Sequence, residues 1–386
     1  MIQFSGKQTM LPKILFINAA SYVYGKEKMA FAVTDGLIKK GYTVHTAICG
    51  WNDGKYKAML ETIGAKSTEI KLGWYYLNKI KWSLDSLINA PLAVIKYYKL
   101  LKRLKPDVII SVSYREVFLL KFFIRKIPVI LGVHDNVISK QDRFFIGRLK
   151  KSITVYTPCS NYIGNQLKEI GIQSNRIKVI QNGIDFNQSA SNMSTAVNSN
   201  TIGIVGQIQR HKGHHILIQA LSQIQKDNID FQLLIFGTGN EAYIQELKRM
   251  IDLYQLNTKV QWMGYEENKD KIYNSISFSV VPTIRPEPFG LVAVEPAIYY
   301  KPVIASDNGG LTEIVVNNVT GLIFKTNNYL SLSDSLKLLL QDEPFVLRLG
   351  KEANQQYKVK FNSNRMIEEY HEVIQSVTSE KSISKN

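Results

Sequence analysis

Two carboxylates with a turn between them are the residues of this sequence best placed to do chemistry. Residues 285–295 read Arg-Pro-Glu-Pro-Phe-Gly-Leu-Val-Ala-Val-Glu, which puts Glu287 and Glu295 eight positions apart. The apolar run before them is typical of a strand, so we expect a loop and then a helix to follow. Phe289, Gly290 and Leu291 would open that helix, where unpaired backbone N–H groups can hold an anion such as a diphosphate.

This spacing suits a nucleotide-sugar, with Glu287 at the sugar, the amides at the diphosphate and Glu295 at the ribose hydroxyls. Alternatively, the two glutamates have no role in binding: they are a charge at the start of a helix and part of its solvent-exposed face. Negative charge near a helix N-terminus is favourable by itself. Taken alone, the spacing does not decide between the two interpretations.

Further polar turns follow other apolar runs. In residues 204–213, a strand leads into a loop whose Arg210 and Lys212 can neutralise a diphosphate. Gly237, in the turn 236–240, lets a ligand approach the backbone, and residues 306–313 form another such turn. Each turn is a weak signal alone, but their order and spacing together are specific.

Two similar halves organise the chain. Residues 1–185 alternate strand and helix patterns, with strands expected at 14–19, 43–48, 108–112 and 128–133 and helices at 30–40 and 91–105. Residues 201–360 repeat the rhythm, with strands expected at 202–206, 231–236, 260–263, 276–281 and 303–306 and helices at 214–224, 241–254, 270–274 and 332–341. This predicts an α/β protein with two Rossmann-like, doubly wound parallel sheets facing a central cleft.

The remaining segments connect and close these halves. The Ser/Asn-rich residues 186–200 predict a linker. Residues 361–386 begin with a helix over 361–376, and we expect the tail 377–386 to be disordered.

Composition limits the cellular setting. The chain has 386 residues and two cysteines, Cys49 and Cys159, so a disulfide framework is not expected and the cytoplasm is the default. The net charge of +16 is unevenly spread: residues 1–182 hold 29 Lys+Arg and 11 Asp+Glu, and the rest hold 19 and 21. Such asymmetry indicates a polyanionic partner or, alternatively, compositional drift.

Taken together, these motifs resemble the large family of retaining glycosyltransferases with the two-domain B-type fold (family 4 type), which includes many lipopolysaccharide, O-antigen and capsule glycosyltransferases. The resemblance covers nearly the whole chain and is densest in residues 179–324. The segments that carry it are 179–185, 206–213, 237–239, 264–265, 286–295 and 302–321.

The resemblance implies a role for each matching position. Catalysis would rest on Glu287 and His134 at the transferred sugar and on Lys212 at the diphosphate. Substrate binding would involve Gly25, Gln207, Arg210, Gly237, Gly264, Tyr265, Phe289, Gly290, Leu291 and Glu295, with the last at the ribose.

Three positions depart from the family pattern. Gln207 stands where the family usually has an arginine, and Arg210 is the candidate to supply the missing charge. The loop at Gly25 is poorer in glycine than usual, and Pro296 should perturb a helix unless it lies in the first turn.

The implied reaction is transfer of a hexosyl or N-acetylhexosaminyl group from a nucleotide-sugar, UDP-linked by preference and GDP-linked otherwise, with retention of configuration. The sequence has no Asp-x-Asp pair, so we expect metal-independent transfer without a cofactor. The expected acceptor is a glycan or a polyprenyl-diphosphate-linked molecule.

Aromatic residues alternate with cations in the basic half, as in 73–82, 97–105 and 121–126. This pattern favours an anionic membrane surface as partner, which places the protein at the inner face of the cytoplasmic membrane.

Two classes of alternative remain. An epimerase of sugar nucleotides or a phosphorylase has a similar architecture but explains the paired glutamates less well. A basic, non-enzymatic nucleic-acid or membrane-binding protein would account for the charge, but the chain lacks a nucleic-acid recognition motif, so no nucleic acid is expected.

Overall fold

The computed structural model describes residues 11–19, 21–71, 80–186 and 200–383. The chain divides into two compact units. The first comprises Met1–Cys159, Ile163–Gln181 and Met366–Asn386, and the second comprises Ser160–Tyr162 and Asn182–Arg365. The boundary therefore precedes Asn182, whereas the sequence placed it after residue 185. The expected linker, 186–200, lies outside the described residues except at its two ends.

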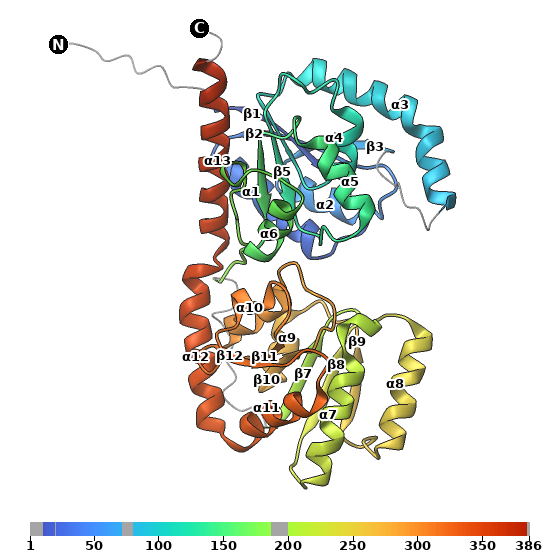
Figure 1. Cartoon of the computed structure of the whole chain (residues 1–386), viewed down its shortest axis with the longest axis vertical. Helices are drawn as coiled ribbons and strands as arrows, with labels where there is room; N and C mark the ends of the chain where they lie inside the picture. Colours follow the sequence, from blue (N-terminus) through green and yellow to red (C-terminus); the bar gives the residue numbers. More distant parts are fainter. Residues whose placement is uncertain (1–10, 20, 72–79, 187–199, 384–386) are drawn as a thin grey trace, which may run out of the picture. The chain divides into compact units, whose positions relative to one another are not determined.

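The first unit is built on a six-stranded parallel sheet (Figure 1). Its strands are β1 (Lys13–Asn18), β2 (Thr43–Cys49), β3 (Lys66–Ile70), β4 (Val108–Ser111), β5 (Val129–Val133) and β6 (Val155–Pro158). They lie in the order β3-β2-β1-β4-β5-β6, so the strand order reverses between β1 and β4.

The second unit repeats this arrangement. Its strands are β7 (Thr201–Val205), β8 (Gln232–Phe236), β9 (Val260–Gly264), β10 (Phe278–Val281), β11 (Val303–Ser306) and β12 (Gly321–Phe324). The sheet order is β12-β11-β10-β7-β8-β9, with the reversal between β7 and β10. The expected α/β architecture with two Rossmann-like sheets is confirmed.

Helices connect the strands. In the first unit they are α1 (Gly25–Lys39), α2 (Lys55–Thr62), α3 (Ile80–Leu104), α4 (Tyr114–Leu120), α5 (Lys140–Leu149) and α6 (Asn161–Glu169). In the second they are α7 (His214–Lys226), α8 (Glu241–Leu253), α9 (Lys269–Asn274), α10 (Leu311–Ile314), α11 (Tyr329–Gln341) and α12 (Glu343–Lys360). Among the described residues, no helix has the length and apolarity needed to cross a bilayer.

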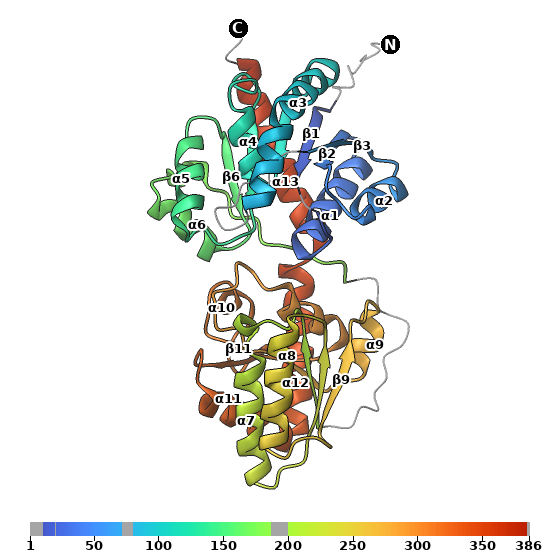
Figure 2. The same cartoon turned by 90° about the vertical axis from the view of Figure 1, so that its right-hand side faces the viewer.

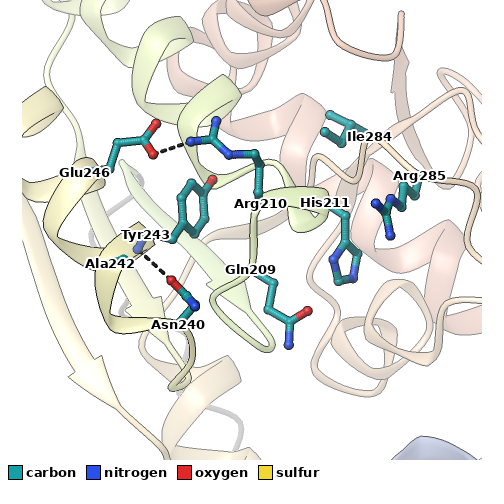
Figure 3. Close-up of a pocket in the computed structure, with 9 residues that line it drawn as sticks. All are labelled: Gln209, Arg210, His211, Asn240, Ala242, Tyr243, Glu246, Ile284 and Arg285. Carbon is teal, nitrogen blue, oxygen red and sulfur yellow. Dashed lines mark hydrogen bonds and ion pairs between the residues drawn. The ribbon is translucent and has the colours of Figure 1, made fainter. Parts of the chain in front are cut away.

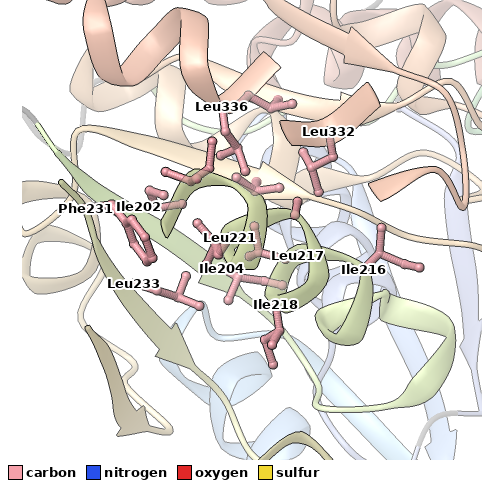
Figure 4. Packing of buried hydrophobic residues seen from close by; sticks show 14 of the residues in the cluster. Ile202, Ile204, Ile216, Leu217, Ile218, Leu221, Phe231, Leu233, Leu332 and Leu336 are labelled. Atoms are coloured by element: carbon pink, nitrogen blue, oxygen red, sulfur yellow. The ribbon is translucent and has the colours of Figure 1, made fainter. Parts of the chain in front are cut away.

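Alternation along β8 shows how the second core is divided. Leu233 and Ile235 pack with residues of α7, α8 and α11 on one face of the sheet. Figure 4 shows Leu233 in this cluster together with residues of α7 and α11. Leu234 and Phe236 pack on the other face with Ile272 of α9. Successive strand residues point to opposite faces, so a strand covered on both sides is apolar throughout.

The C-terminal helix α13 (Ser363–Ile383) is longer than expected. The prediction of a disordered tail from residue 377 is wrong as far as Ile383, and residues 384–386 lie outside the described residues. From Met366 the helix belongs to the first unit, where Ile374 is fully buried. There the Tyr42 hydroxyl lies 2.7 Å from His371 Nδ1, and Gly36 of α1 leaves room for Ile367.

The first unit also buries a carboxylate near the carboxyl end of β4. Glu116 of α4 is 1% exposed and accepts a hydrogen bond from the Ser113 hydroxyl. Burial raises the pKa of Glu116 to about 7, because the ionised form loses its hydration.

We expect a pH dependence of stability from Glu116. Below about pH 4.5 the Glu116 carboxyl is protonated in both the folded and the unfolded state, and the contribution of its raised pKa to stability is fully present. This contribution is lost as pH rises from about 4.5 through about 7, because the unfolded carboxyl ionises first. Relative to Glu116→Gln, the wild-type free energy of unfolding should therefore fall by about 3 kcal/mol across this range. Urea unfolding of the full chain at several pH values measures the difference.

The exposed Glu169, which pairs with Arg143, provides the matched control. Its substitution Glu169→Gln should leave the pH profile nearly unchanged. A difference between wild type and Glu116→Gln that stays constant with pH would contradict the account.

Candidate functional site

The loops after β7 and β10 meet at the carboxyl edge of the second sheet, where the strand order reverses. Open parallel sheets bind ligands at this place, because the loops after neighbouring strands diverge there. Lys212 comes from the first loop and Glu287 from the second. The Lys212 ammonium donates a hydrogen bond to Glu287 Oε1, and the two side chains are 29% and 14% exposed. Two of the predicted residues are thus brought into direct contact.

Backbone contacts fix the position of Lys212. The Ile284 N–H donates to the His211 carbonyl at 2.9 Å, and the Thr283 hydroxyl donates to the same carbonyl at 3.0 Å. Gly213 has a φ of 76°, and a Cβ there would collide with the Pro282 carbonyl oxygen. The two loops therefore pack backbone against backbone, which only glycine permits at position 213.

The turn after β11 holds the other side of the Glu287 loop. The Gly310 N–H donates to the Glu287 carbonyl at 2.7 Å. Gly309 has a φ of 59°, and a Cβ there would collide with the same carbonyl oxygen. The Ser160 hydroxyl donates to the Pro288 carbonyl at 2.5 Å. The turn 306–313, which the sequence analysis described as one that lets a ligand approach the backbone, supports this loop.

The predicted helix over Phe289–Glu295 is wrong. Gly290 has a φ of 107° and precedes η3, a three-residue 3₁₀ segment (Leu291–Ala293), and Glu295 begins a second one, η4 (Glu295–Tyr299). Pro296 lies in the first turn of η4, where its missing N–H does no harm, but it would break a helix begun at Gly290. Phe289 is buried against Phe361, with ring centroids 5.6 Å apart.

Three backbone amides of this turn were predicted to bind an anion. Among the described residues, no acceptor takes a hydrogen bond from the N–H groups of Phe289, Gly290 or Leu291. These amides remain able to donate to a bound anion. Only the backbone of Phe289 is available for this, because its side chain belongs to the core.

Glu295 is held by residues that sequence reasoning missed. Lys269 Nζ lies 2.5 Å from its Oε2, and the Tyr273 hydroxyl donates to the same oxygen at 2.8 Å. Both partners come from α9, and the Tyr273 ring lies 5.2 Å from that of Tyr299. Burial and the Glu295 carboxylate raise the pKa of Tyr273, so its hydroxyl stays a donor. The helix expected at 270–274 was the available signal, but its pairing with Glu295 depends on the fold.

Arg210 lies in a neighbouring pocket (Figure 3). Its guanidinium pairs with Glu246 of α8 and lies 5.1 Å from the Tyr243 ring centroid. The open cavity beside it measures about 690 Å³, and its lining comprises Gln209, Arg210, His211, Asn240, Ala242, Tyr243, Glu246, Ile284 and Arg285. Gln207 is exposed and accepts a hydrogen bond from the Gln209 amide at 3.2 Å.

Three glycines join the strand ends beside this pocket. The Gly237 N–H donates to the Gly264 carbonyl at 2.7 Å, and a Cβ on Gly237 would collide with the Gly206 carbonyl oxygen. The loops after β7, β8 and β9 are thereby drawn together. Tyr265 follows Gly264 with 68% of its surface exposed, so its ring is free to contact a flat ligand.

The first unit carries the other two predicted residues. Gly25 is not in a loop: it is the first residue of α1, whose start is fixed by a hydrogen bond of 2.9 Å from the Tyr24 N–H to Glu27. His134 follows β5, partly buried, and its ring lies over Gly132. Lys26 Nζ lies 3.3 Å from Asp135, and this ammonium lowers the pKa of the carboxyl.

The described residues contain no group of three or more His, Cys, Asp or Glu side chains arranged to hold a metal ion. The expectation of metal-independent transfer remains a prediction.

Comparison with known proteins places these features in a family. Residues 187–356 match the model of glycosyl transferases group 1, and residues 23–188 match that of glycosyltransferase family 4. The capsular polysaccharide biosynthesis glycosyltransferase CapM of Staphylococcus aureus is 28% identical over 207 residues, 53% of this chain and 54% of that protein. A glycosyltransferase of Methanocaldococcus jannaschii, MJ1178, is 30% identical over 255 residues, 62% and 66% of the two chains. The matches span between about half and two thirds of these curated relatives.

Solved structures share the fold over nearly the whole chain. Anabaena Alr3699/HepE in complex with UDP superposes with a TM-score of 0.81 at 20% identity, covering 94% of this chain and 100% of that one. Its complex with UDP-glucose gives 0.79 at 21% identity, covering 95% and 100%. With two family models side by side and two Rossmann-like sheets, the chain belongs to the family 4 type of GT-B glycosyltransferases.

Proposed function

We propose that this protein transfers a hexosyl or N-acetylhexosaminyl group from a UDP-sugar to a glycan or polyprenyl-diphosphate-linked acceptor, with retention of configuration, in the synthesis of a surface polysaccharide. A GDP-sugar is the alternative donor. The observation that carries the proposal is the contact between Lys212 and Glu287 at the sheet position where nucleotides bind.

The donor diphosphate would be bound by charge and by amides. Lys212 turns from Glu287 to the phosphates, and the N–H groups of Phe289, Gly290 and Leu291 donate to the same anion. As the bond to the sugar breaks, negative charge accumulates on the leaving diphosphate, and these donors stabilise it. Arg210 can add to this only by leaving Glu246, its partner in the structure.

The nucleoside would lie toward α9. The Glu295 carboxylate accepts hydrogen bonds from the ribose hydroxyls, while Lys269 and Tyr273 keep the carboxylate in place. Tyr265 offers an exposed ring to the base at the end of β9. The complexes of Anabaena Alr3699/HepE with UDP and with UDP-glucose support uracil as the base.

Retention would follow if an acceptor hydroxyl attacked the sugar carbon on the face from which the diphosphate departs, with the hydroxyl proton passing to an oxygen of the leaving phosphate. Glu287 faces the sugar and, once Lys212 moves to the phosphates, stabilises positive charge at the reacting carbon rather than acting as a nucleophile. The role at the transferred sugar that the resemblance implies for His134 remains a prediction. The proposal uses no metal and no cofactor.

Affinities for UDP and for uridine distinguish the proposed role of Glu295 from that of Lys212. If Glu295 binds ribose, Glu295→Gln should weaken both UDP and uridine by roughly 10- to 100-fold, the value of one hydrogen bond to a charged group. Calorimetric titration of the full chain with UDP, and competition by uridine, measure both affinities. The matched control is Asp230→Asn, which breaks an ion pair with Lys259 before β9, at the other edge of the sheet.

Lys212→Gln should behave differently, because its partner is the diphosphate. We expect UDP affinity to fall by roughly tenfold or more while uridine affinity stays the same. The same titrations give the result. A variant that lost UDP and uridine equally, or neither, would contradict the assignment of Lys212 to the phosphates.

A further inference from the structure

The helix α3 presents large apolar side chains to solvent. Leu84, Leu87, Ile88, Leu92 and Ile95 are all exposed, Ile88 by 76%. Their spacing of three and four residues places them on one face of the helix. Ser86, Ala93, Tyr97 and Leu100 are buried on the opposite face. One face of α3 therefore packs against the rest of the first unit, and the apolar stripe on the other face is exposed to solvent.

The stripe continues onto the segment after α4. The ring of Tyr98, itself exposed, lies 5.7 Å from that of Phe123, and Phe122 beside it is 62% exposed. We call this surface the α3 apolar face; it comprises Leu84, Leu87, Ile88, Leu92, Ile95, Tyr98, Phe122 and Phe123. Figure 2 shows α3 as a long helix near α4 in the first unit.

Cations accompany this face. Lys102 Nζ lies 4.8 Å from the Tyr98 ring centroid, and the Arg125 guanidinium lies 5.2 Å from that of Phe122. The helix α3 carries five Lys or Arg residues and one acid, Asp85. The basic residues of α3 and of the segment after α4 are Lys81, Lys96, Lys99, Lys102, Arg103, Lys121, Arg125 and Lys126.

This composition favours a lipid bilayer over another protein as the partner of the α3 apolar face. Protein–protein interfaces are depleted of lysine, whereas peripheral membrane helices combine an apolar face with lysine and arginine at its margin. Long basic side chains can lie along apolar surface while their charged ends reach lipid headgroups. Anionic lipid then attracts each cation near the surface.

We propose that the α3 apolar face docks on an anionic bilayer, with α3 parallel to the membrane plane and its leucine and isoleucine side chains in the headgroup region. The proposal stands on this surface and is independent of the donor chemistry. Of the two adjacent tyrosines in the stretch 97–105 that was expected to contact the membrane, Tyr97 is buried in the core and only Tyr98 reaches the surface. Residues 73–79 of the expected stretch 73–82 lie outside the described residues.

Vesicle flotation of the full chain tests the proposal. Vesicles of phosphatidylcholine with and without phosphatidylglycerol are compared at low and high salt. We expect binding only to the anionic vesicles, weakened by salt, since the attraction between the cations and the lipid is screened. The triple variant Leu87→Gln, Ile88→Gln and Leu92→Gln should raise the lipid concentration for half binding by roughly tenfold or more.

The second unit offers a matched control. Leu253, Leu347 and Val359 are 75%, 63% and 76% exposed, on α8 and α12. Their triple change to glutamine removes as many exposed apolar side chains and should leave vesicle binding unchanged. Circular dichroism of both triple variants confirms that each is folded.

Two results would overturn the proposal. One is flotation of the folded α3 variant equal to that of wild type. The other is an absence of wild-type binding to anionic vesicles, together with a wild-type dimer in sedimentation that the α3 variant dissociates. That second result would assign the face to a contact between copies of the chain.

Discussion

The close approach of three backbone segments is the constraint on which the site of the second unit depends. The loop that carries Glu287 is hydrogen-bonded on one side to the turn at Gly309 and Gly310, and it packs on the other side against Gly213. A side chain at either Gly213 or Gly309 would collide with a carbonyl oxygen. Because these contacts are made by main-chain atoms, the positions of Lys212 and Glu287 follow from the fold of the loops.

Each glutamate of the site is held by a lysine and is only partly exposed. Lys212 pairs with Glu287, and Lys269 pairs with Glu295. Partly buried charges of this kind are unfavourable without a partner, so the lysines stabilise the carboxylates in the absence of a ligand. In the proposed function, a nucleoside diphosphate would bring an anion for Lys212 and hydroxyl donors for Glu295. In the proposed mechanism Glu295 would keep Lys269, whereas Glu287 would lose Lys212 and face the positive charge that develops at the reacting carbon of the sugar.

Much of the fold could be predicted because buried parallel strands are continuous apolar runs. The strand at 303–306 agrees with β11 residue by residue, and the expected 202–206 differs from β7 by one position. The strand β3 was missed because it lies at the sheet edge and reads Lys-Ser-Thr-Glu-Ile, with its polar residues partly exposed. Apolar periodicity carries little signal for such a strand.

The errors near the site have one local and one non-local cause. Proline at position 296 and a positive φ at Gly290 convert the expected helix into two short 3₁₀ segments. The support of Glu295 by Lys269 joins residues 26 positions apart, so no local pattern reveals it. The glutamates themselves could be found, because their spacing and the glycine turns around them are properties of the sequence.

Hydrogen exchange of the full chain with and without saturating UDP tests most directly that these loops form the donor site. The account predicts slower exchange in peptides that cover 206–213, 264–273 and 287–295, because UDP would engage their amides or hold their loops in place. Peptides from α12 should be unaffected. Unchanged exchange in all three segments, with UDP shown to bind, would place the nucleotide elsewhere and contradict the account.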